Sequence, residues 1–286
     1  MCDQDHFEED RIEFEALRSV TRKQFGMMLG AGVAMLLPQA ANAVAVTESD
    51  VNVTTPDGTA DCYFVRPASG TGAGVLVWPD IFGLRPAFRQ MGKTLAESGY
   101  SVLVVNPFYR TKKAPTADAG AQTPIPQLMP LAQSLNETTH MTDAKAFIGW
   151  LDKQSSVAKN RKMGTQGYCM GGPMAFRTAA AVPDRVGAVA TFHGGGLVTD
   201  MPNSPHLEAA KTKAQFLIAI AANDDKRAPN DKVVLKETFA KVNLAAEIEV
   251  YPAMHGWCPP DTTVYDKEQS DKAWSRLLAL YGKALA

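Results

Sequence analysis

Short apolar runs alternate with segments of helix length from residue 74 to the C-terminus, and this order restricts the possible folds more than any other feature. The runs 74–78 and 101–105 are almost wholly apolar, as is typical of strands buried on both faces. The order predicts an α/β fold with a mainly parallel, doubly wound sheet. Further strands are expected at 162–167, 186–192, 215–221 and 246–251, and helices at about 86–98, 141–155, 170–181, 232–242 and 270–285.

Two segments outside this alternation have signatures of their own. Residues 51–54 and 60–65 alternate apolar and polar side chains around Asp57-Gly58, which predicts an antiparallel hairpin at the start of the sheet. Residues 112–136 are rich in Pro, Ala, Gln and Thr and have no periodicity. Because catalytic groups of such sheets lie beyond the carboxyl ends of the strands, we expect 112–136 to pass over the mouth of a site there. A single domain over 44–286 accounts for all these elements.

Residues 1–43 are interpreted as an export signal with a polar extension rather than as part of the fold. The segment 21–25, Thr-Arg-Lys-Gln-Phe, resembles a twin-arginine signal with Lys23 in place of the second arginine. The apolar run 26–37 is shorter than the roughly 20 residues that a stable membrane-spanning helix needs. The small residues at 41–43 predict cleavage after Ala43 and a periplasmic protein. The alternatives are an N-terminal anchor helix and a cytoplasmic enzyme.

The charge and cysteine content restrict the class of partner. With 29 Lys and Arg against 30 Asp and Glu, the formal net charge is −1, so no basic field indicates nucleic acid or an anionic membrane. Small molecules fit this balance better. Cys2 would leave with the signal, and Cys62, Cys169 and Cys258 would remain. An odd number of cysteines in an oxidising compartment leaves at least one thiol outside any intramolecular disulfide.

A candidate nucleophile lies where an expected strand meets an expected helix. The segment 167–172 is Gly-Tyr-Cys-Met-Gly-Gly, the G-x-nucleophile-x-G pattern with Cys169 at its centre. Such a turn strains the backbone of the nucleophile, and the flanking glycines let the chains pass closely. It also sets the amide of Met170 at a helix N-terminus, ready to donate to an oxyanion. A buried structural cysteine is the alternative interpretation.

Two histidines compete for the role of base. In proteins with this turn the chain order is nucleophile, acid, histidine. His255 follows the expected strand 246–251, at a carboxyl end of the sheet where the base belongs. His193 also ends a strand, but it comes too early for an acid to lie between it and the nucleophile. We therefore predict His255 as the base and interpret His193 as part of the pocket wall.

Two adjacent carboxylates compete for the role of acid. Asp224 and Asp225 both follow the expected strand 215–221, and such a carboxylate fixes the tautomer of the base and stabilises its charged form. Asp224 follows the strand at the shorter distance. Side chains of neighbouring residues point apart, so one of the two meets the imidazole and the other has a different role, such as a helix cap.

Together these residues resemble the dienelactone hydrolase (carboxymethylenebutenolidase) family of α/β-hydrolases from roughly residue 51 to the C-terminus. The resemblance implies the α/β-hydrolase fold, a catalytic triad of Cys169, Asp224 and His255, and an oxyanion hole formed by the amides of Ile81 and Met170. It implies no metal ion and no organic cofactor. The segments that carry it are 79–83, 106–110, 167–172, 223–224 and 255–256.

The resemblance also implies substrate-binding positions. Asp80 stands where the family has a glutamate that pairs with the cysteine, and Arg110 matches one of two arginines that hold a substrate carboxylate. At the position of the second arginine the chain has Trp257 followed by Cys258, and Trp257 would form an apolar wall instead. The two-arginine clamp is thus incomplete, which indicates a substrate other than a dienelactone.

The expected function is cysteine-dependent hydrolysis of a small ester or lactone, through an acyl-enzyme on Cys169. The alternative belongs to another class: a redox-sensitive or non-catalytic binding protein on the same scaffold. In that case Cys169 would pair with Cys258, which lies three residues after the expected base His255.

Overall fold

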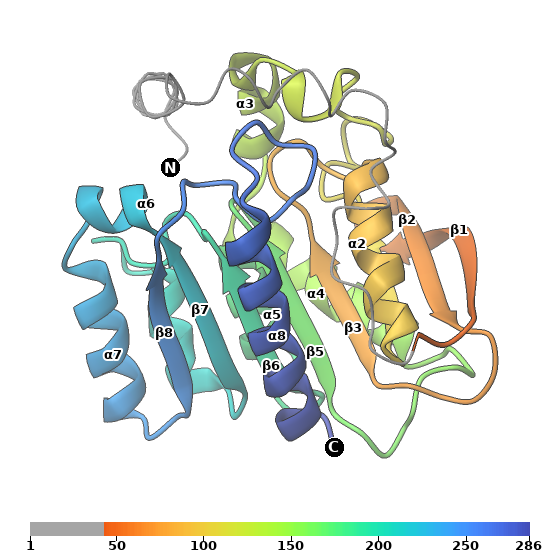
Figure 1. Ribbon diagram of the computed structural model, residues 1–286. Helices are drawn as coiled ribbons and strands as arrows, with labels where there is room; N and C mark the ends of the chain where they lie inside the picture. The colour runs from red at the N-terminus through yellow and green to blue at the C-terminus, as the bar shows by residue number, and fades with distance from the viewer. Residues whose placement is uncertain (1–42) are drawn as a thin grey trace.

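One mixed eight-stranded sheet organises the chain. The structure is a computed structural model that describes residues 43–286. Residues 1–42 of the expected export signal lie outside the described residues. The strand order is β1-β2-β4-β3-β5-β6-β7-β8 (Figure 1). The pairs β1–β2 and β2–β4 are antiparallel and all other pairs are parallel. The strands are β1 Val46–Thr55, β2 Gly58–Pro67, β3 Gly74–Trp78, β4 Ser101–Val105, β5 Met163–Tyr168, β6 Val186–Phe192, β7 Gln215–Ala221 and β8 Ala246–Tyr251.

The apolar runs of the sequence form the centre of the sheet. Every residue of β3 and β4 is buried, and alternate side chains of β3 enter different cores. Val75 and Val77 belong to the core on one face, whereas Leu76 and Trp78 belong to the core on the other. A strand with apolar contacts on both sides needs packing elements on both faces of the sheet. Together with the parallel pairing among the strands β3 to β8, this confirms the predicted mainly parallel α/β fold.

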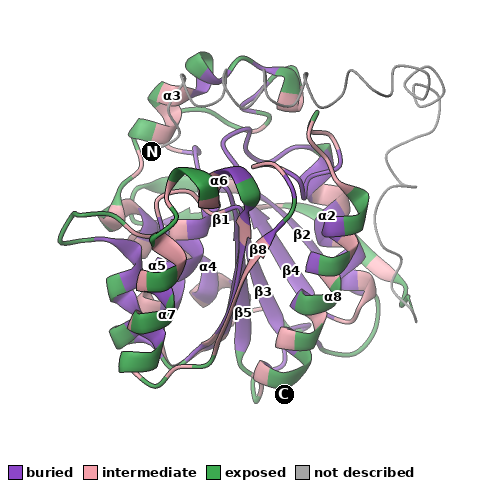
Figure 2. Ribbon diagram, turned by 60° about the vertical axis from the view of Figure 1, so that its left-hand side comes forward, coloured by how far each residue is buried: buried purple, intermediate pink, exposed green. Residues whose placement is uncertain are grey.

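Helices cover both faces of this sheet. Their outer sides are exposed and their inner sides buried, as the colours of Figure 2 show. Within residues 43–286, no helix is both long enough and apolar enough to cross a membrane. On one face lie α2 (Pro86–Glu97) and α8 (Lys267–Ala284), and on the other α4 (Glu137–Leu151), α5 (Gly171–Ala181) and α7 (Asp231–Lys241).

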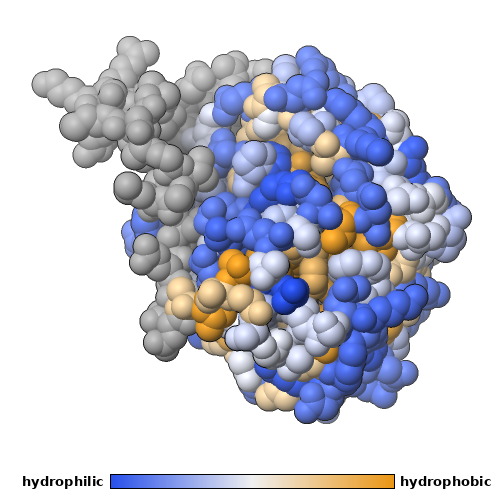
Figure 3. Space-filling model, turned by 90° about the vertical axis from the view of Figure 1, so that its right-hand side faces the viewer, coloured by the Kyte–Doolittle hydropathy of each residue, from blue (hydrophilic) through white to orange (hydrophobic). Residues whose placement is uncertain are grey.

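The predicted hairpin forms one edge of the sheet. Thr55 pairs with Gly58, so the two loop residues are Pro56 and Asp57, one position earlier than the Asp57-Gly58 pair. The outer strand β1 is largely exposed, and two salt bridges join it to α2. On this side of the molecule hydrophilic residues surround several smaller hydrophobic patches (Figure 3). Charged side chains on an edge strand oppose pairing with another chain.

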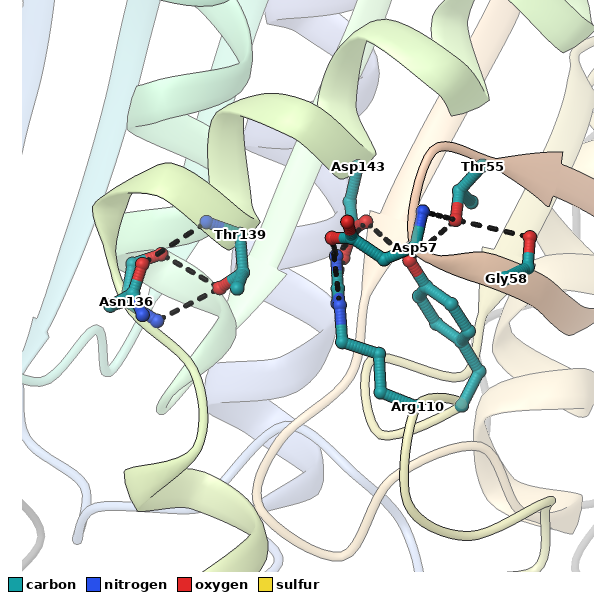
Figure 4. Close-up of polar contacts among 8 residues, drawn as sticks. Thr55, Asp57, Gly58, Arg110, Asn136, Thr139 and Asp143 are labelled. Atoms are coloured by element: carbon teal, nitrogen blue, oxygen red, sulfur yellow. Dashed lines mark hydrogen bonds and ion pairs between the residues drawn. The ribbon is translucent and has the colours of Figure 1, made fainter.

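Helix α4 begins at Glu137, four residues before the expected start. The cause is a capping box: Asn136 Oδ1 accepts from the Thr139 amide at 3.2 Å, and Thr139 Oγ1 accepts from the Asn136 amide at 2.8 Å (Figure 4). These bonds satisfy amides that a helix start otherwise leaves without partners. The apolar periodicity on which the prediction rested is weak in this first turn, and the cap defines the start instead.

The segment 112–136 is not wholly irregular. It contains the short 3₁₀ turn η3 (Gly120–Gln122) and the helix α3 (Ile125–Gln133), above the carboxyl ends of the strands (Figure 1). Ile125 and Leu128 pack in a small core with Ile81 and Phe82, in the loop that follows β3. Two further elements were not expected from the sequence: the 3₁₀ turn η4 (Pro205–Lys211) and the helix α6 (Ala222–Arg227).

Candidate active site

Cys169 lies in the sharp turn between β5 and α5. Its φ is +52°, a backbone conformation that residues other than glycine seldom adopt. A Cβ on Gly167 would lie 1.9 Å from the carbonyl oxygen of Gly171, and one on Gly171 would lie 2.4 Å from the carbonyl oxygen of Trp78. Side chains at these two positions would clash with backbone, so glycines are required for the chain to cross here.

Two backbone amides near Cys169 can donate to a ligand. Ile81 follows β3, whose end lies beside the turn, and it lines the same cavity as Cys169. Met170 is the N-cap residue of α5. Within residues 43–286, neither amide donates a hydrogen bond to a protein acceptor. Amides at the start of a helix and in a tight loop are typical donors to an oxyanion.

His255 contacts one of the two candidate acids. Its Nδ1 lies 2.7 Å from Oδ2 of Asp224, and its backbone amide donates to Oδ1 of Asn223 at 2.8 Å. The helix α6 starts directly after β7 and turns the next side chain away, so Asp225 pairs with Lys232 at 2.6 Å. Asp224, and not Asp225, therefore meets the imidazole.

A cavity of about 470 Å³ joins these groups at the carboxyl ends of the strands. Cys169, His255 and Asp224 line it together with Ile81. Residues 121–125 also contribute to the wall, so the segment 112–136 borders the site. A mainly apolar cavity of this size with a few convergent polar groups suits a small organic molecule. Other apolar lining residues are Phe82, Leu197, Ile220, Leu235, Met254 and Val264.

A cysteine with a positive φ in a strand-to-helix turn, and a histidine–carboxylate pair above a mainly parallel sheet, match the arrangement of α/β-hydrolases. The family model described as "Dienelactone hydrolase family" matches residues 60–285. The chain belongs to this family. It is accordingly a hydrolase that acts on lactones or esters.

One curated relative supports this membership, and two solved structures share the fold. The carboxymethylenebutenolidase of Rhodococcus opacus is 30% identical over 197 residues, which cover 68% of this chain and 74% of the relative. A dienelactone hydrolase-like promiscuous phosphotriesterase from metagenomic libraries has the same fold, with a TM-score of 0.70, 20% identity and coverage of 85% of this chain and 100% of its own. The dienelactone hydrolase of Anabaena variabilis gives a TM-score of 0.56 at 17% identity, covering 84% and 99%.

In this family member, Asp80 is bound by an arginine. Both of its carboxylate oxygens accept from Arg85, at 2.6 and 3.0 Å, and Oδ1 also accepts from the amide of Phe82. Burial raises the pKa of Asp80, and the charge of Arg85 opposes this rise. Asp80 thus lines the cavity that Cys169 also lines, and its carboxylate is bound by Arg85.

Arg110 lies apart from the cavity of this hydrolase. Its guanidinium pairs with Asp57 of the hairpin turn at 2.6 Å and with Asp143 of α4 at 2.6 Å (Figure 4). Arg110 is not among the residues that line the cavity. The expected role in holding a substrate carboxylate does not fit this placement, because both faces of the fork contact carboxylates of the protein. Arg110 instead joins the hairpin to α4.

His193, rather than Trp257, forms the wall beside the base. His193 lines the cavity, is fully buried, has a φ of +42°, and its ring centroid lies 5.0 Å from that of His255. Burial, and then the neighbouring His255, lower the pKa of His193 well below its usual value, so the ring is neutral. Trp257 stacks on Tyr251 behind His193 and does not line the cavity, which corrects its expected role as a wall.

The three cysteines in residues 43–286 form no disulfide. Cys258 is buried in a second, small cavity with residues of α2 and α8, whereas Cys169 lines the large one. Burial raises the pKa of Cys258 well above that of an ordinary thiol. The bridge on which the redox alternative depends is absent from this structure. Residues 43–286 also contain no cluster of three His, Cys, Asp or Glu side chains that could hold a metal ion.

Several residues around the site were missed by the sequence analysis. Asn223 is adjacent to the candidate acids, and its amide oxygen orients the backbone of His255. Arg85 follows Asp80 by five residues, and in a loop this spacing does not indicate that the two side chains are in contact. Asp261, which binds Arg85, is 176 residues away from it, so no local pattern could have joined them.

Proposed function

We propose that this chain hydrolyses small esters or lactones through an acyl-enzyme on Cys169, with His255 as base and Asp224 as its orienting carboxylate. The observation that carries the proposal is the 2.7 Å contact between Asp224 Oδ2 and His255 Nδ1 in the cavity that Cys169 also lines. A carboxylate at Nδ1 keeps the proton there and leaves Nε2 to exchange a proton with the sulfur.

Acylation begins when His255 takes the proton of the Cys169 thiol and the sulfur attacks the carbonyl carbon. A C–S bond forms, and the carbonyl electron pair moves onto oxygen, where the amides of Ile81 and Met170 donate to it. The N-terminus of α5 adds a favourable dipole. The intermediate collapses with cleavage of the C–O bond, and His255 gives its proton to the departing oxygen. In a lactone that oxygen stays on the acyl chain.

Deacylation repeats this sequence with water. His255 accepts a proton from water, and the oxygen of that water attacks the thioester carbon. The same two amides stabilise the second oxyanion. The C–S bond then breaks, and His255 returns the proton to sulfur. The sum is an ester and water converted to an acid and an alcohol, with the enzyme regenerated.

The first test is the substitution Cys169→Ala. We expect kcat for 4-nitrophenyl acetate and for a small lactone to fall by at least about 10³-fold, because the variant lacks the sulfur on which the proposed acyl-enzyme forms. Acid-quenched wild-type enzyme should carry one acyl group on the peptide that contains Cys169, as measured by mass spectrometry.

The matched control is Cys258→Ala, in a cavity apart from the site, which should keep most of the activity. Wild-type turnover in Cys169→Ala would contradict the proposal. Loss of activity in Cys258→Ala with an intact fold, together with a Cys169–Cys258 bridge in the wild-type protein, would favour the redox alternative.

We also propose that residues 1–43 direct export to the periplasm and are removed after Ala43. The support comes from the twin-arginine-like segment 21–25 and the small residues at 41–43. Strand β1 begins at Val46, so cleavage at this point leaves every strand of the sheet in the mature protein.

A further inference from the structure

Arg85 connects two loops at the cavity that are far apart in sequence. Nη1 and Nη2 bind the carboxylate of Asp80, at 2.6 and 3.0 Å, in the loop after β3. On its other side, Nε and Nη2 bind the carboxylate of Asp261, at 2.7 and 2.9 Å, in the loop after His255. The Arg85 side chain is 1% exposed, and its guanidinium lies over the ring of Phe88.

Each loop carries one of the groups that the proposed mechanism uses. In the first loop, Ile81 lies between Asp80 and Phe82. Oδ1 of Asp80 accepts a hydrogen bond from the backbone amide of Phe82 at 3.0 Å. The Ile81 amide is thus held between two anchored residues. Arg85 Nη1 also donates to the carbonyl oxygen of Gly83 at 3.3 Å, which fixes the far end of the same turn.

In the second loop the link runs to the base. Asp261 precedes Thr262, whose hydroxyl lies within donating distance of the carbonyl oxygens of Gly256, at 2.9 Å, and Pro259, at 3.1 Å, and Gly256 follows His255. Asp261 is therefore linked to the loop after β3 through Arg85, and to the loop that carries His255 through Thr262. The cavity lining includes Asp80, Ile81, His255, Gly256 and Thr262, so both ends of this path reach the site.

Stability alone gives a weak reason for such a cluster. One buried guanidinium lies between two carboxylates, and desolvation of buried ions offsets much of their mutual attraction. Bidentate arginine–carboxylate pairs do have strict geometry, because the planar fork binds in fixed directions. A cluster of this kind fixes the distance between the two loops it joins.

We propose that Arg85 and Asp261 are positioning residues, which hold the Ile81 amide at a fixed distance from Cys169 and His255. This inference rests on the proposed function. Both halves of that reaction pass through an oxyanion, so a displaced Ile81 amide slows both, whereas binding of the neutral ester changes little.

The most direct test is Asp261→Asn, which keeps the shape of the side chain and removes its charge. The Asp80–Arg85 pair stays intact, and Asp261 is partly exposed, so the fold should survive. We expect kcat for 4-nitrophenyl acetate to fall by about 10- to 100-fold, with KM within about twofold of wild type. Asp261→Ala should lower kcat further.

A second measurement separates the amide from the thiol. Alkylation of Cys169 by iodoacetamide needs the sulfur and His255 but forms no oxyanion. Its rate should stay within about twofold of wild type in Asp261→Asn. The matched control is Asp50→Asn on the edge strand β1. It removes the exposed ion pair with Arg89 and should leave both rates unchanged.

Arg85→Gln provides a second variant, with a larger loss of kcat and a lower melting temperature, because Asp80 is left buried and unpaired. The proposal is overturned if Asp261→Asn behaves like Asp50→Asn, or if alkylation and hydrolysis fall in parallel, since the thiol itself has then moved. If wild-type hydrolysis does not depend on Cys169, the proposed function fails first, and the Cys169→Ala variant reveals that separately.

Discussion

Asp224 and Asp225 are neighbours in the chain, yet their carboxylates meet different partners. Asp224 reaches His255, whereas Asp225 reaches Lys232 on α7. The divergence follows from the helix α6, in which successive side chains are about 100° apart around the axis. The sequence left both candidates open because it gave no sign that a helix starts directly after β7.

We expect Asp224→Asn to lower kcat by about 10²- to 10⁴-fold, because an amide at Nδ1 favours the wrong tautomer of His255. Asp225→Asn should change kcat by less than about tenfold, since it weakens only a partly exposed ion pair. Steady-state kinetics with 4-nitrophenyl acetate measures both. Equal losses in the two variants would contradict the assignment of Asp224.

Arg110 shows the limit of motif matching for a single residue. The motif at 106–110 fits the family, and the side chain nevertheless pairs with Asp57 and Asp143 away from the cavity. A motif specifies the position of a residue along the chain. Where a long guanidinium points depends on which carboxylates lie within reach in the folded molecule, and the sequence does not reveal these.

At the scale of elements, α4 and α5 are joined by a buried polar contact. His140 of α4 lies with Nδ1 2.8 Å from Nη1 of Arg177 on α5. Burial first, and then the charges of Arg177 and Arg110, lower the pKa of His140 to about 3. The imidazole is therefore neutral in the folded protein, where it accepts a hydrogen bond from the guanidinium.

This contact predicts a pH-dependent stability. Between about pH 6.5 and pH 3 the unfolded chain protonates His140 and the folded chain does not, so the free energy of unfolding falls as the pH falls through this window. The pKa of buried His193 is also lowered and acts in the same direction. His140→Gln keeps an acceptor for Arg177 but cannot titrate.

We expect the loss of stability between pH 6.5 and 5.5 to be smaller in His140→Gln than in wild type by about 1 kcal/mol. Urea unfolding at these two pH values measures it. Because the buried acids are unchanged in the variant, their contributions cancel in the comparison. Parallel pH profiles for the two proteins would show that His140 titrates normally in the fold.

Among the elements, strands were predicted more closely than helices. The runs that form β3, β4, β6, β7 and β8 have the expected bounds. In β3 and β4, burial on both faces leaves a continuous apolar signal, whereas the half-buried edge strand β8 alternates apolar residues with glutamates. The short helices α3 and α6 have no such signal. α3 is held by Ile81 and Phe82 from a distant loop, and α6 is six residues long, too short for periodicity to be visible.

At the scale of the whole molecule, the parallel sheet gathers the site. Cys169 follows β5, Asp224 follows β7 and His255 follows β8, so the three groups meet at one edge although 86 positions separate the first from the last. The loop after β3, which lies on the other side of β5 from β7 and β8, adds Ile81. Parallel strands place their carboxyl ends together, and this makes chain order a guide to a site in such folds.

The export proposal is tested on the full-length chain. Expressed in a bacterium with twin-arginine export, the protein should appear in the periplasmic fraction with Val44 as its first residue, as shown by intact-mass measurement. Replacing Arg22 and Lys23 by glutamine should retain it in the cytoplasm, whereas replacing Lys112 and Lys113 should not. A full-length periplasmic or membrane-bound product would support an anchor instead.

The sequence by itself determined the alternation of strands and helices, the glycines around Cys169 and the order of Cys169, Asp224 and His255 along the chain. These are local properties, set by apolar spacing and by the backbone freedom of single residues. The tertiary structure decided which carboxylate meets His255, where Arg110 points and how Arg85 joins Asp80 to Asp261. Such contacts depend on side-chain directions within a few ångströms, between segments that only packing of the whole sheet brings together.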